Sequence, residues 1–484
     1  MRTTYTIAIV FLTNLSWALQ PPAPYGPTPS ARQMRWHQIG FYGFLHFGIN
    51  TFTDKEWGYG DEDPAIFNPT AFDANQIAQV AREAGMRGLV LTAKHHDGFC
   101  LWPSQYTEHS VKNSPWRGGR GDVVKELSDA CRRYGLLFGV YLSPWDRNRS
   151  DYGRPEYIQY YRQQLRELLT GYGEIFIVWL DGANGGDGYY GGARQTRRID
   201  SLTYYDWPNT WQIIRDLMPM AVIFSDVGPD VRWVGNERGR AGEPCWATLT
   251  PQGAPGNTKA DLNHGDRHGS QWLPAECDVS IRPGWFYHRS EDGRVKTPMQ
   301  LFEIYLNSVG RGACLNLNVP PDTTGQIHPN DVLSLKGLRS ILDQTFSFNI
   351  ATKARVTASQ VRGDQRGFGP ENLFDSDIST YWSTDDQVRA AELILDFDLP
   401  VTFDIVAVQE CILLGQRIDN FALEAWQGDD WHLLAKGTSI GHLRLVRVEP
   451  TTTTRFRFRV VDAAACPAIA ELGLYASPYS RVSH

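Results

Sequence analysis

The sequence lacks several features that would assign a broad function at once. Its 484 residues hold 47 Lys and Arg against 54 Asp and Glu, and the net charge of −7 offers no overall attraction for nucleic acid or an anionic membrane surface. The seven cysteines are scattered without a CxxC pair, which argues against a zinc cluster. No GxGxxG follows the first predicted strand, which argues against a dinucleotide-binding fold.

Long apolar runs are also missing. The first 18 residues contain Arg2 and then an apolar stretch that Thr and Asn interrupt, shorter than the ~20 residues that a membrane-spanning helix needs. Ser16 and Ala18 supply the small residues of a cleavage site. We therefore expect a signal peptide over 1–18, a Pro-rich linker over 19–35, and a secreted mature chain, extracellular or periplasmic, with no membrane span.

Aromatic residues, in contrast, are abundant, at 12% of the chain with 16 Trp. Large aromatic cores would explain this excess. A sugar-binding surface would explain it as well, because Trp and Tyr combine a large apolar face with a polar handle. Composition alone leaves both explanations open.

Strand-like apolar runs alternate with helical patterns from about residue 36 to 345. A predicted helix over 72–85 precedes a strand over 88–95, and a helix over 155–169 precedes a strand over 174–181. Near-continuous apolar strands indicate a parallel sheet covered by helices. At least four such units in roughly 300 residues favour an irregular (β/α)8-like barrel over a doubly wound sheet.

The pattern changes after this region. Residues 346–484 consist of short β-rich stretches separated by turn residues, with little helical periodicity. That pattern is typical of a β-sandwich. Cys411 and Cys466 could form a disulfide within it, and the odd total of seven leaves at least one thiol unpaired.

The strand over 174–181 ends in a carboxylate, Asp181, and its alternation places Trp179 and Asp181 on the same face. Barrel active sites are built at the C-terminal ends of the strands. An Asp at a strand end more often caps a helix or lies in a loop. Trp179 on the same face favours a sugar-binding site.

The ends of other predicted strands, and the loops after them, also carry polar or aromatic side chains. They are His46, Glu56, Trp57, His95, His96 and Tyr141. Each alone could be a core or loop residue, and their coincidence at one rim is what indicates a site. Adjacent His95 and His96 point to opposite faces of a strand, which argues against a shared metal ion.

These motifs resemble the family 29 α-L-fucosidases: His46 in FLHFG, Glu56-Trp57, KHHDGF over 94–99, Tyr141 in VYLSPWD, and WLDG with Asp181. The resemblance extends from about Trp36 to Asp322. It implies a retaining exo-α-L-fucosidase without a cofactor, which acts on fucosylated glycans through a covalent fucosyl-enzyme intermediate. It further implies Asp181 as the nucleophile and a fucose pocket lined by His46, Glu56, Trp57, His95, His96, Tyr141, Trp179 and Trp285.

A retaining mechanism needs a second carboxyl group ~5–5.5 Å from the nucleophile, as acid and then base. The candidates are Asp226, Asp230, Glu237, Glu243 and Glu276. The stretch 228–239 looks like the segment that bears the acid/base in the subfamily that cleaves branched α-1,3/1,4-fucosides, which favours Glu237 and leaves Glu276 as the runner-up. A Gly/Tyr-rich insert over 184–192 is a departure that lengthens the spacing from Asp181.

Two other functions remain open at this point. One is a glycan-binding protein on an inactivated barrel, against which the intact Asp181 argues. The other is an exo-glycosidase for a related sugar such as α-L-galactose.

The C-terminal region resembles discoidin-like modules, in residues 372–375, 380–383 and 470–474. Such modules often bind glycans, and some hold a structural calcium ion. A domain that merely buttresses the barrel is an equal alternative. The sequence does not fix the oligomeric state.

Overall fold

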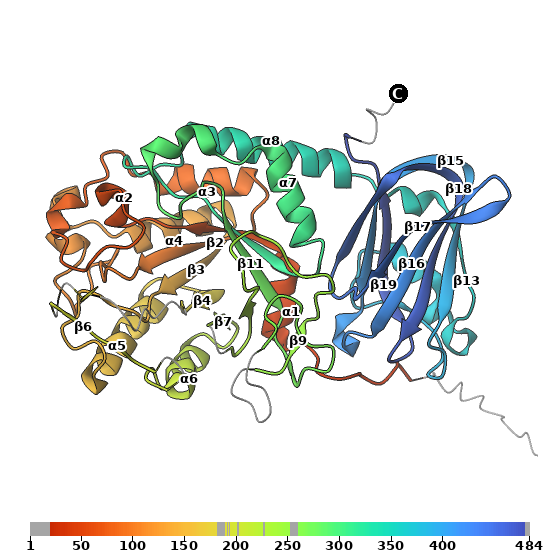
Figure 1. Cartoon of the computed structure of the whole chain (residues 1–484), viewed down its shortest axis with the longest axis horizontal. Helices are drawn as coiled ribbons and strands as arrows, with labels where there is room; N and C mark the ends of the chain where they lie inside the picture. The colour runs from red at the N-terminus through yellow and green to blue at the C-terminus, as the bar shows by residue number, and fades with distance from the viewer. Residues whose placement is uncertain are drawn as a thin grey trace, which may run out of the picture.

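The computed structural model describes residues 20–181, 189–190, 192, 194–200, 203–225, 228–251 and 260–479. The expected signal peptide, most of the Gly/Tyr-rich insert and Asp226 lie outside the described residues. The chain forms two regions, an N-terminal barrel with its helices and a C-terminal region of antiparallel strands (Figure 1). The predicted order of barrel and β-sandwich is therefore confirmed.

The barrel is one sheet of eight strands in which hydrogen-bonded neighbours are parallel. In spatial order these are β7 (Val222–Phe224), β4 (Ile177–Trp179), β3 (Leu137–Leu142), β2 (Gly88–Lys94), β1 (Phe41–Leu45), β12 (Cys314–Asn318), β11 (Ala275–Ser280) and β8 (Arg232–Trp233). A parallel bridge between Phe224 and Val231 joins the two ends of this order. The barrel is thus nearly closed.

Helices surround the barrel: α1 (Ala31–Ile39), α2 (Asn50–Thr53), α3 (Ala74–Glu83), α4 (Val123–Tyr134), α5 (Pro155–Gly171), α6 (Trp207–Leu217), α7 (Pro298–Asn307) and α8 (Pro329–Phe346). Their ends follow from local sequence. Asp122 caps α4 by accepting the Lys125 N–H, and Gly135 ends it at a φ of +67° that a side chain would strain. Of the helices in the part of the chain that is described, none has the length and apolar character needed to cross a membrane.

The chain also contains shorter strands and 3-10 helices. Small strand pairs are β5 (Tyr189–Tyr190) with β6 (Gln195–Thr196), and β9 (Thr248–Leu249) with β10 (Gln271–Trp272). 3-10 helices lie at Pro64–Ile66, Val111–Asn113, Trp116–Gly119, Arg289–Arg294, Ile350–Lys353, Arg362–Asp364, Arg366–Phe368, Pro370–Phe374 and Ile412–Leu414.

The predicted linker over 19–35 differs from the structure in its last residues. Helix α1 begins at Ala31, where a capping box from Ser30 and Gln33 starts it. The preceding extended segment lies along the C-terminal region, because the Tyr25 N–H donates to the Leu414 carbonyl at 2.9 Å. This part of the chain is therefore structured rather than a free connector.

The C-terminal region contains β13 (Arg355–Ala358), β14 (Trp382–Ser383), β15 (Ala391–Glu410), β16 (Ile418–Gln427), β17 (Asp430–Thr438), β18 (Arg444–Ala463) and β19 (Ala468–Tyr475). The long strands β15 and β18 pair antiparallel, with register shifts that interrupt their ladder. The strands enclose an apolar core that includes Trp382, Phe456 and Phe458. This region begins after α8 ends at Phe346, near the expected boundary.

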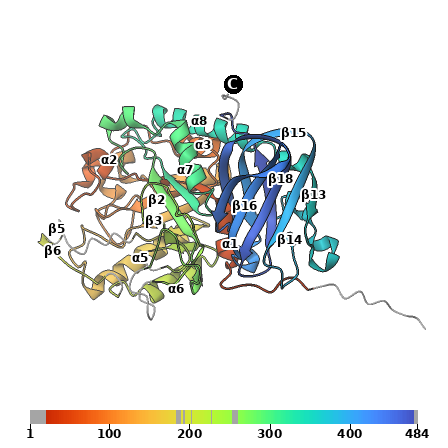
Figure 2. The same cartoon turned by 45° about the vertical axis from the view of Figure 1, so that its right-hand side comes forward.

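The two regions are packed against each other. Figure 1 and Figure 2 both place α1 and α7 on the side of the barrel that faces the C-terminal strands. The Leu445 N–H donates to the Gly310 carbonyl at 2.8 Å, and the Ala247 N–H donates to Gln416 Oε1 at 2.9 Å. The barrel rim therefore has a fixed orientation relative to the sandwich.

The disulfide considered for Cys411 and Cys466 does not form. All seven cysteines are buried and unbonded. Cys466 Sγ lies 3.4 Å from Arg417 Nη1, while Cys411 packs in a small apolar cluster with Ala470. The location of both cysteines in the C-terminal region was therefore not enough to predict a disulfide between them.

Candidate active site

Asp181 lies two residues after the end of β4, at the C-terminal rim of the barrel. The Tyr141 hydroxyl on β3 donates to Asp181 Oδ2 at 2.8 Å, and His96 Nε2 lies 3.6 Å from the same oxygen. The pairing of Tyr141 with Trp179 in adjacent strands brings the hydroxyl beside the carboxylate. The Asp181 side chain is 19% exposed, so it is oriented by the barrel and still accessible.

His96 is a buried, neutral hydrogen-bond acceptor. Its Nδ1 lies 2.7 Å from Ser143 Oγ, and the Ser143 hydroxyl donates to the Trp145 carbonyl at 2.7 Å. A hydroxyl has one hydrogen, so His96 Nδ1 must donate to Ser143, which leaves the lone pair on Nε2. Burial lowers the pKa of His96 to about 4, which keeps the ring neutral near pH 7.

His46 follows β1 and is held in the same way. Its Nδ1 lies 2.9 Å from Asn318 Oδ1, which also accepts the His46 backbone N–H at 3.1 Å. An amide oxygen can only accept, so His46 Nδ1 donates and Nε2 becomes an acceptor. Burial lowers the pKa of His46 to about 3. Both His46 and His96 thus present neutral rings with acceptor Nε2 atoms.

His95 lies between these two rings and Tyr141. Its ring is 4.1 Å from that of His96 and stacks on Tyr141 at 5.7 Å between centroids. Burial lowers its pKa well below the usual value. Its Nδ1 is buried without a hydrogen-bond partner among the described residues.

The Glu56 carboxylate is hydrogen-bonded to other groups of the protein. Its carboxylate accepts the N–H groups of Trp285 at 2.9 Å and Phe286 at 3.2 Å, and it lies 2.6 Å from His288 Nε2. Glu56 therefore anchors the loop that carries Trp285. The Trp285 ring in turn lies 5.0 Å from that of His46.

The two other predicted tryptophans differ sharply in exposure. Trp57 is 54% exposed and sets its ring against those of His96 and Trp145, at 5.7 and 5.4 Å. Trp179 is 7% exposed, stacks on Phe224 at 4.0 Å, and donates Nε1–H to Glu276 at 2.7 Å. Trp57 thus has surface available for a ligand, whereas the Trp179 ring is largely covered by other aromatic rings.

The candidates for the second carboxyl group have distinct environments. Glu276 is fully buried, and its oxygens accept hydrogen bonds from Trp179, Tyr42 and Asn316. The other three described candidates are Asp230, which pairs with Arg215 at 2.6 Å, Glu243, which pairs with Arg444, and Glu237. Glu237 follows β8, is exposed, and accepts the Nε1–H of Trp285 at 3.2 Å.

Comparisons with known proteins agree with this arrangement. A family model described as Alpha-L-fucosidase matches residues 30–344. The chain belongs to the α-L-fucosidase family. It is therefore a glycoside hydrolase. Alpha-L-fucosidase 1 of Arabidopsis thaliana is 45% identical over 481 residues, which cover 98% of this chain and 92% of that protein.

Solved structures share this fold over most of the chain. A glycoside hydrolase 29 family member from an unknown rumen bacterium is 46% identical with a TM-score of 0.84, over 94% of this chain and 78% of that one. A fucosidase from Ruminococcus gnavus, solved in complex with fucose, is 33% identical with a TM-score of 0.87, over 97% and 98% of the two chains.

The fucosidase barrel also contains a buried carboxyl pair, Glu276 and Asp278, of which only Glu276 was identified from the sequence. Asp278 lies on β11 two residues from Glu276, so both side chains share one face of the strand. Burial and the charge of Glu276 raise the pKa of Asp278 well above its usual range, with smaller contributions from Glu237 and Asp181. The charged form of Asp278 is therefore disfavoured in this pair.

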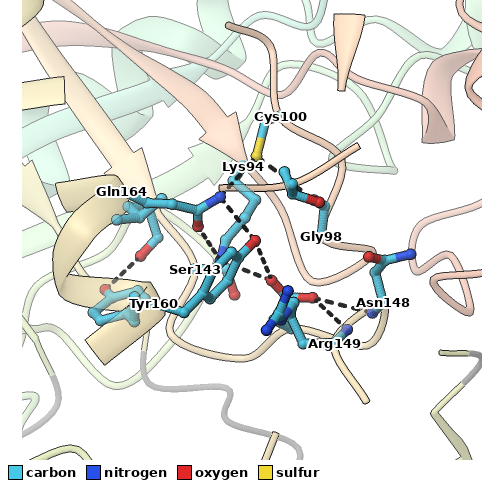
Figure 3. Close-up of polar contacts among 12 residues, drawn as sticks. Lys94, Gly98, Cys100, Ser143, Asn148, Arg149, Tyr160 and Gln164 are labelled. Carbon is cyan, nitrogen blue, oxygen red and sulfur yellow. Dashed lines mark hydrogen bonds and ion pairs between the residues drawn. The ribbon is translucent and has the colours of Figure 1, made fainter. Parts of the chain in front are cut away.

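A buried lysine holds the histidine segment of the fucosidase in place. Lys94 is fully buried, and its Nζ lies 2.9 Å from Asp146 Oδ2 and 3.0 Å from Gln164 Oε1 (Figure 3). Asp146 Oδ1 accepts the N–H groups of Asn148 and Arg149 at 3.0 and 3.1 Å. This network joins the end of β2, which leads into His95 and His96, to the loop after β3.

Proposed function

We propose that this chain is a retaining exo-α-L-fucosidase that removes terminal α-1,3/1,4-linked L-fucose from branched glycans. The observation that carries the proposal is the orientation of Asp181 by the Tyr141 hydroxyl beside neutral histidine acceptors. The fucose complex of the Ruminococcus gnavus relative supports the same sugar for this chain. His46 and His96 would accept hydrogen bonds from fucose hydroxyls through Nε2.

In the first step, an Asp181 oxygen attacks the anomeric carbon as the bond to the glycosidic oxygen breaks. Glu237 gives its proton to that leaving oxygen, and a fucosyl ester of Asp181 results. In the second step, water attacks the same carbon, its proton goes to Glu237, and Asp181 is released. Neither step uses a cofactor.

Three features favour Glu237 as the acid/base. It is exposed on the rim, it has no arginine partner among the described residues, and Trp285 fixes one of its oxygens. Glu276 is instead buried in the barrel interior, where its carboxylate accepts hydrogen bonds from Trp179 and Asn316. The α-1,3/1,4 preference rests on the resemblance of the stretch 228–239.

The nucleophile is tested with Asp181→Ala on an aryl α-L-fucoside. We expect hydrolysis to be lost and azide to restore turnover, with fucosyl azide as the product. Unchanged hydrolysis in this variant would remove Asp181 from the mechanism.

Linkage and sugar are tested with the wild-type protein. We expect faster fucose release from a Lewis trisaccharide than from a linear α-1,2-fucoside, and slower cleavage of the matching aryl α-L-galactoside. Binding of fucose without any release would instead support the glycan-binding alternative. Preference for the galactoside would support the other.

We also propose that the chain is secreted after removal of residues 1–18. A separate proposal is that the discoidin-like sandwich holds a calcium ion. Asp375, Asp377 and Glu471 would hold it, because their carboxylate oxygens are of the kind that calcium prefers. Burial, and then the charges of Asp375 and Asp377, raise the pKa of Glu471 to about 7, and its Oε1 is buried without a donor. Within the described ranges no three metal-binding side chains already converge, so an ion would have to draw these together.

A further inference from the structure

The loop that carries Glu237 also borders a cavity. This cavity, of about 680 Å³, is lined by the loop residues on either side of Glu237, by Glu243, by Asn263 and His264, and by Arg311. Glu237 itself is not in the lining and contacts Trp285. The same loop therefore carries the candidate acid/base and supplies much of the lining of the cavity.

The cavity is positively charged on a protein of net charge −7. Its lining contains Arg238, Arg240 and Arg311 against a single carboxylate, Glu243, for a net charge of +2. Glu243 is already shared between Arg311, at 3.7 Å, and Arg444. Arg238 and Arg240 are exposed, and in the part of the chain that is described neither guanidinium has a carboxylate partner.

The backbone of this loop is fixed without help from the two arginine side chains. Asn236 Oδ1 accepts the Arg238 N–H at 3.1 Å, and Asn236 Nδ2 donates to the Arg240 carbonyl at 2.9 Å. Asn263 Nδ2 donates to the Val234 carbonyl at 3.1 Å. The guanidinium groups are thus available for a ligand, and their replacement should leave the loop in place.

The part of the substrate that approaches this loop is the leaving group. Because Glu237 is proposed to protonate the glycosidic oxygen, the glycan that departs has to extend past this loop. We propose that the cavity binds an anionic group, a sulfate ester or a sugar carboxylate, on the glycan to which fucose is attached. Guanidinium groups form paired, charge-assisted hydrogen bonds with such anions. This inference rests on the proposed fucosidase reaction with Glu237.

The test compares kcat/KM for a neutral Lewis trisaccharide with kcat/KM for the same trisaccharide bearing a sulfate ester or a sialic acid on its galactose. We expect the wild-type protein to favour at least one acidic substrate, and the preferred one identifies the source of the anion. The double variant Arg238→Gln/Arg240→Gln should lower the acidic-to-neutral ratio about tenfold. High salt should lower the same ratio in the wild-type protein.

A charge-matched control is Arg366→Gln/Arg389→Gln, which removes two exposed arginines of the sandwich. This control should keep the wild-type ratio. A ratio unchanged in the cavity variant, with the neutral substrate still cleaved, would overturn the anionic subsite and leave the proposed function intact. Failure of the wild-type protein to cleave any of the three substrates would contradict the proposed function itself.

Discussion

Buried ionisable groups occur in both regions of the molecule, but their surroundings differ. In the sandwich, Glu410 is 2% exposed, and its oxygens accept the backbone N–H groups of Arg417, Ile418 and Gly441 at 2.7 to 2.9 Å. At the barrel rim, His46 and His96 are also buried, yet each is hydrogen-bonded through Nδ1 and retains an acceptor at Nε2.

Burial and a shifted pKa therefore do not by themselves mark a functional site. Burial raises the pKa of Glu410 to about 7, as strong a perturbation as many catalytic groups have. Its hydrogen bonds are nevertheless supplied by its own surroundings, as expected of a structural group. A group that keeps an open acceptor or an accessible oxygen at a strand end, such as Asp181, is the better candidate for chemistry.

The largest expected effect separates these two carboxyl groups. Asp181→Asn should lower kcat on an aryl fucoside by roughly 10⁴-fold with little change in Tm, because it removes the nucleophile. Glu410→Gln should keep kcat while lowering stability by about 1–3 kcal/mol, because the amide places a donor against backbone donors. Steady-state kinetics and thermal denaturation measure both. A large loss of kcat in the Glu410 variant would contradict a purely structural role for Glu410.

A smaller effect is expected at the acid/base. Glu237→Ala should slow release from a natural glycan by roughly 10²–10⁴-fold and spare an aryl fucoside with a good leaving group. Glu243→Ala, six residues further along the chain and paired with Arg444, should leave both rates nearly unchanged. Equal losses on the two substrates in the Glu237 variant would shift the role to another carboxyl group.

The buried ion pair between Lys94 and Asp146 is expected to stabilise the barrel. Lys94→Met leaves Asp146 buried without its cation and should destabilise the barrel by about 3–5 kcal/mol. Lys94→Met combined with Asp146→Asn should recover part of that loss, because no unpaired charge remains. Denaturant unfolding measures both variants. Equal stability of the single and double variants would show that the ion pair is not the cause.

The smallest expected effect concerns Glu471. Its folded pKa of about 7 lies above the usual value of 4.5, so its contribution to stability is present at low pH and is lost as pH rises through 7. Calcium should therefore raise Tm more at pH 8 than at pH 6, and Glu471→Gln should reduce that gain. Glu410→Gln is the matched control, since its calcium response should stay like that of the wild-type protein. A calcium response that is absent at both pH values would contradict the proposed ion.

Sequence patterns predicted the elements better than the contacts between them. The barrel and the rim position of Asp181 follow from periodicity, because parallel strands place their C-terminal ends together. The acceptor state of His46 could not be predicted, since it depends on Asn318, which is 272 residues away in the sequence. For the same reason the anchoring of the Trp285 loop by Glu56 was missed.

The environment of Trp179 illustrates the same limit. Strand alternation placed Trp179 on the face of Asp181, which favoured a sugar-binding site, but it could not predict how far other side chains cover the ring. The ring is stacked on Phe224, a residue of the neighbouring strand β7. Which aromatic rings stay open is decided by packing between strands, and here Trp57 on a loop is the exposed one.

The central claim is that Asp181 forms a covalent bond to fucose. The most direct measurement is mass spectrometry of the protein after reaction with a 2-deoxy-2-fluoro-fucosyl trapping reagent, followed by peptide mapping. We expect one fluorofucosyl group, on the peptide that contains Asp181, and no label in Asp181→Ala. Label on any other carboxyl group, or turnover with inversion at the anomeric carbon, would contradict it.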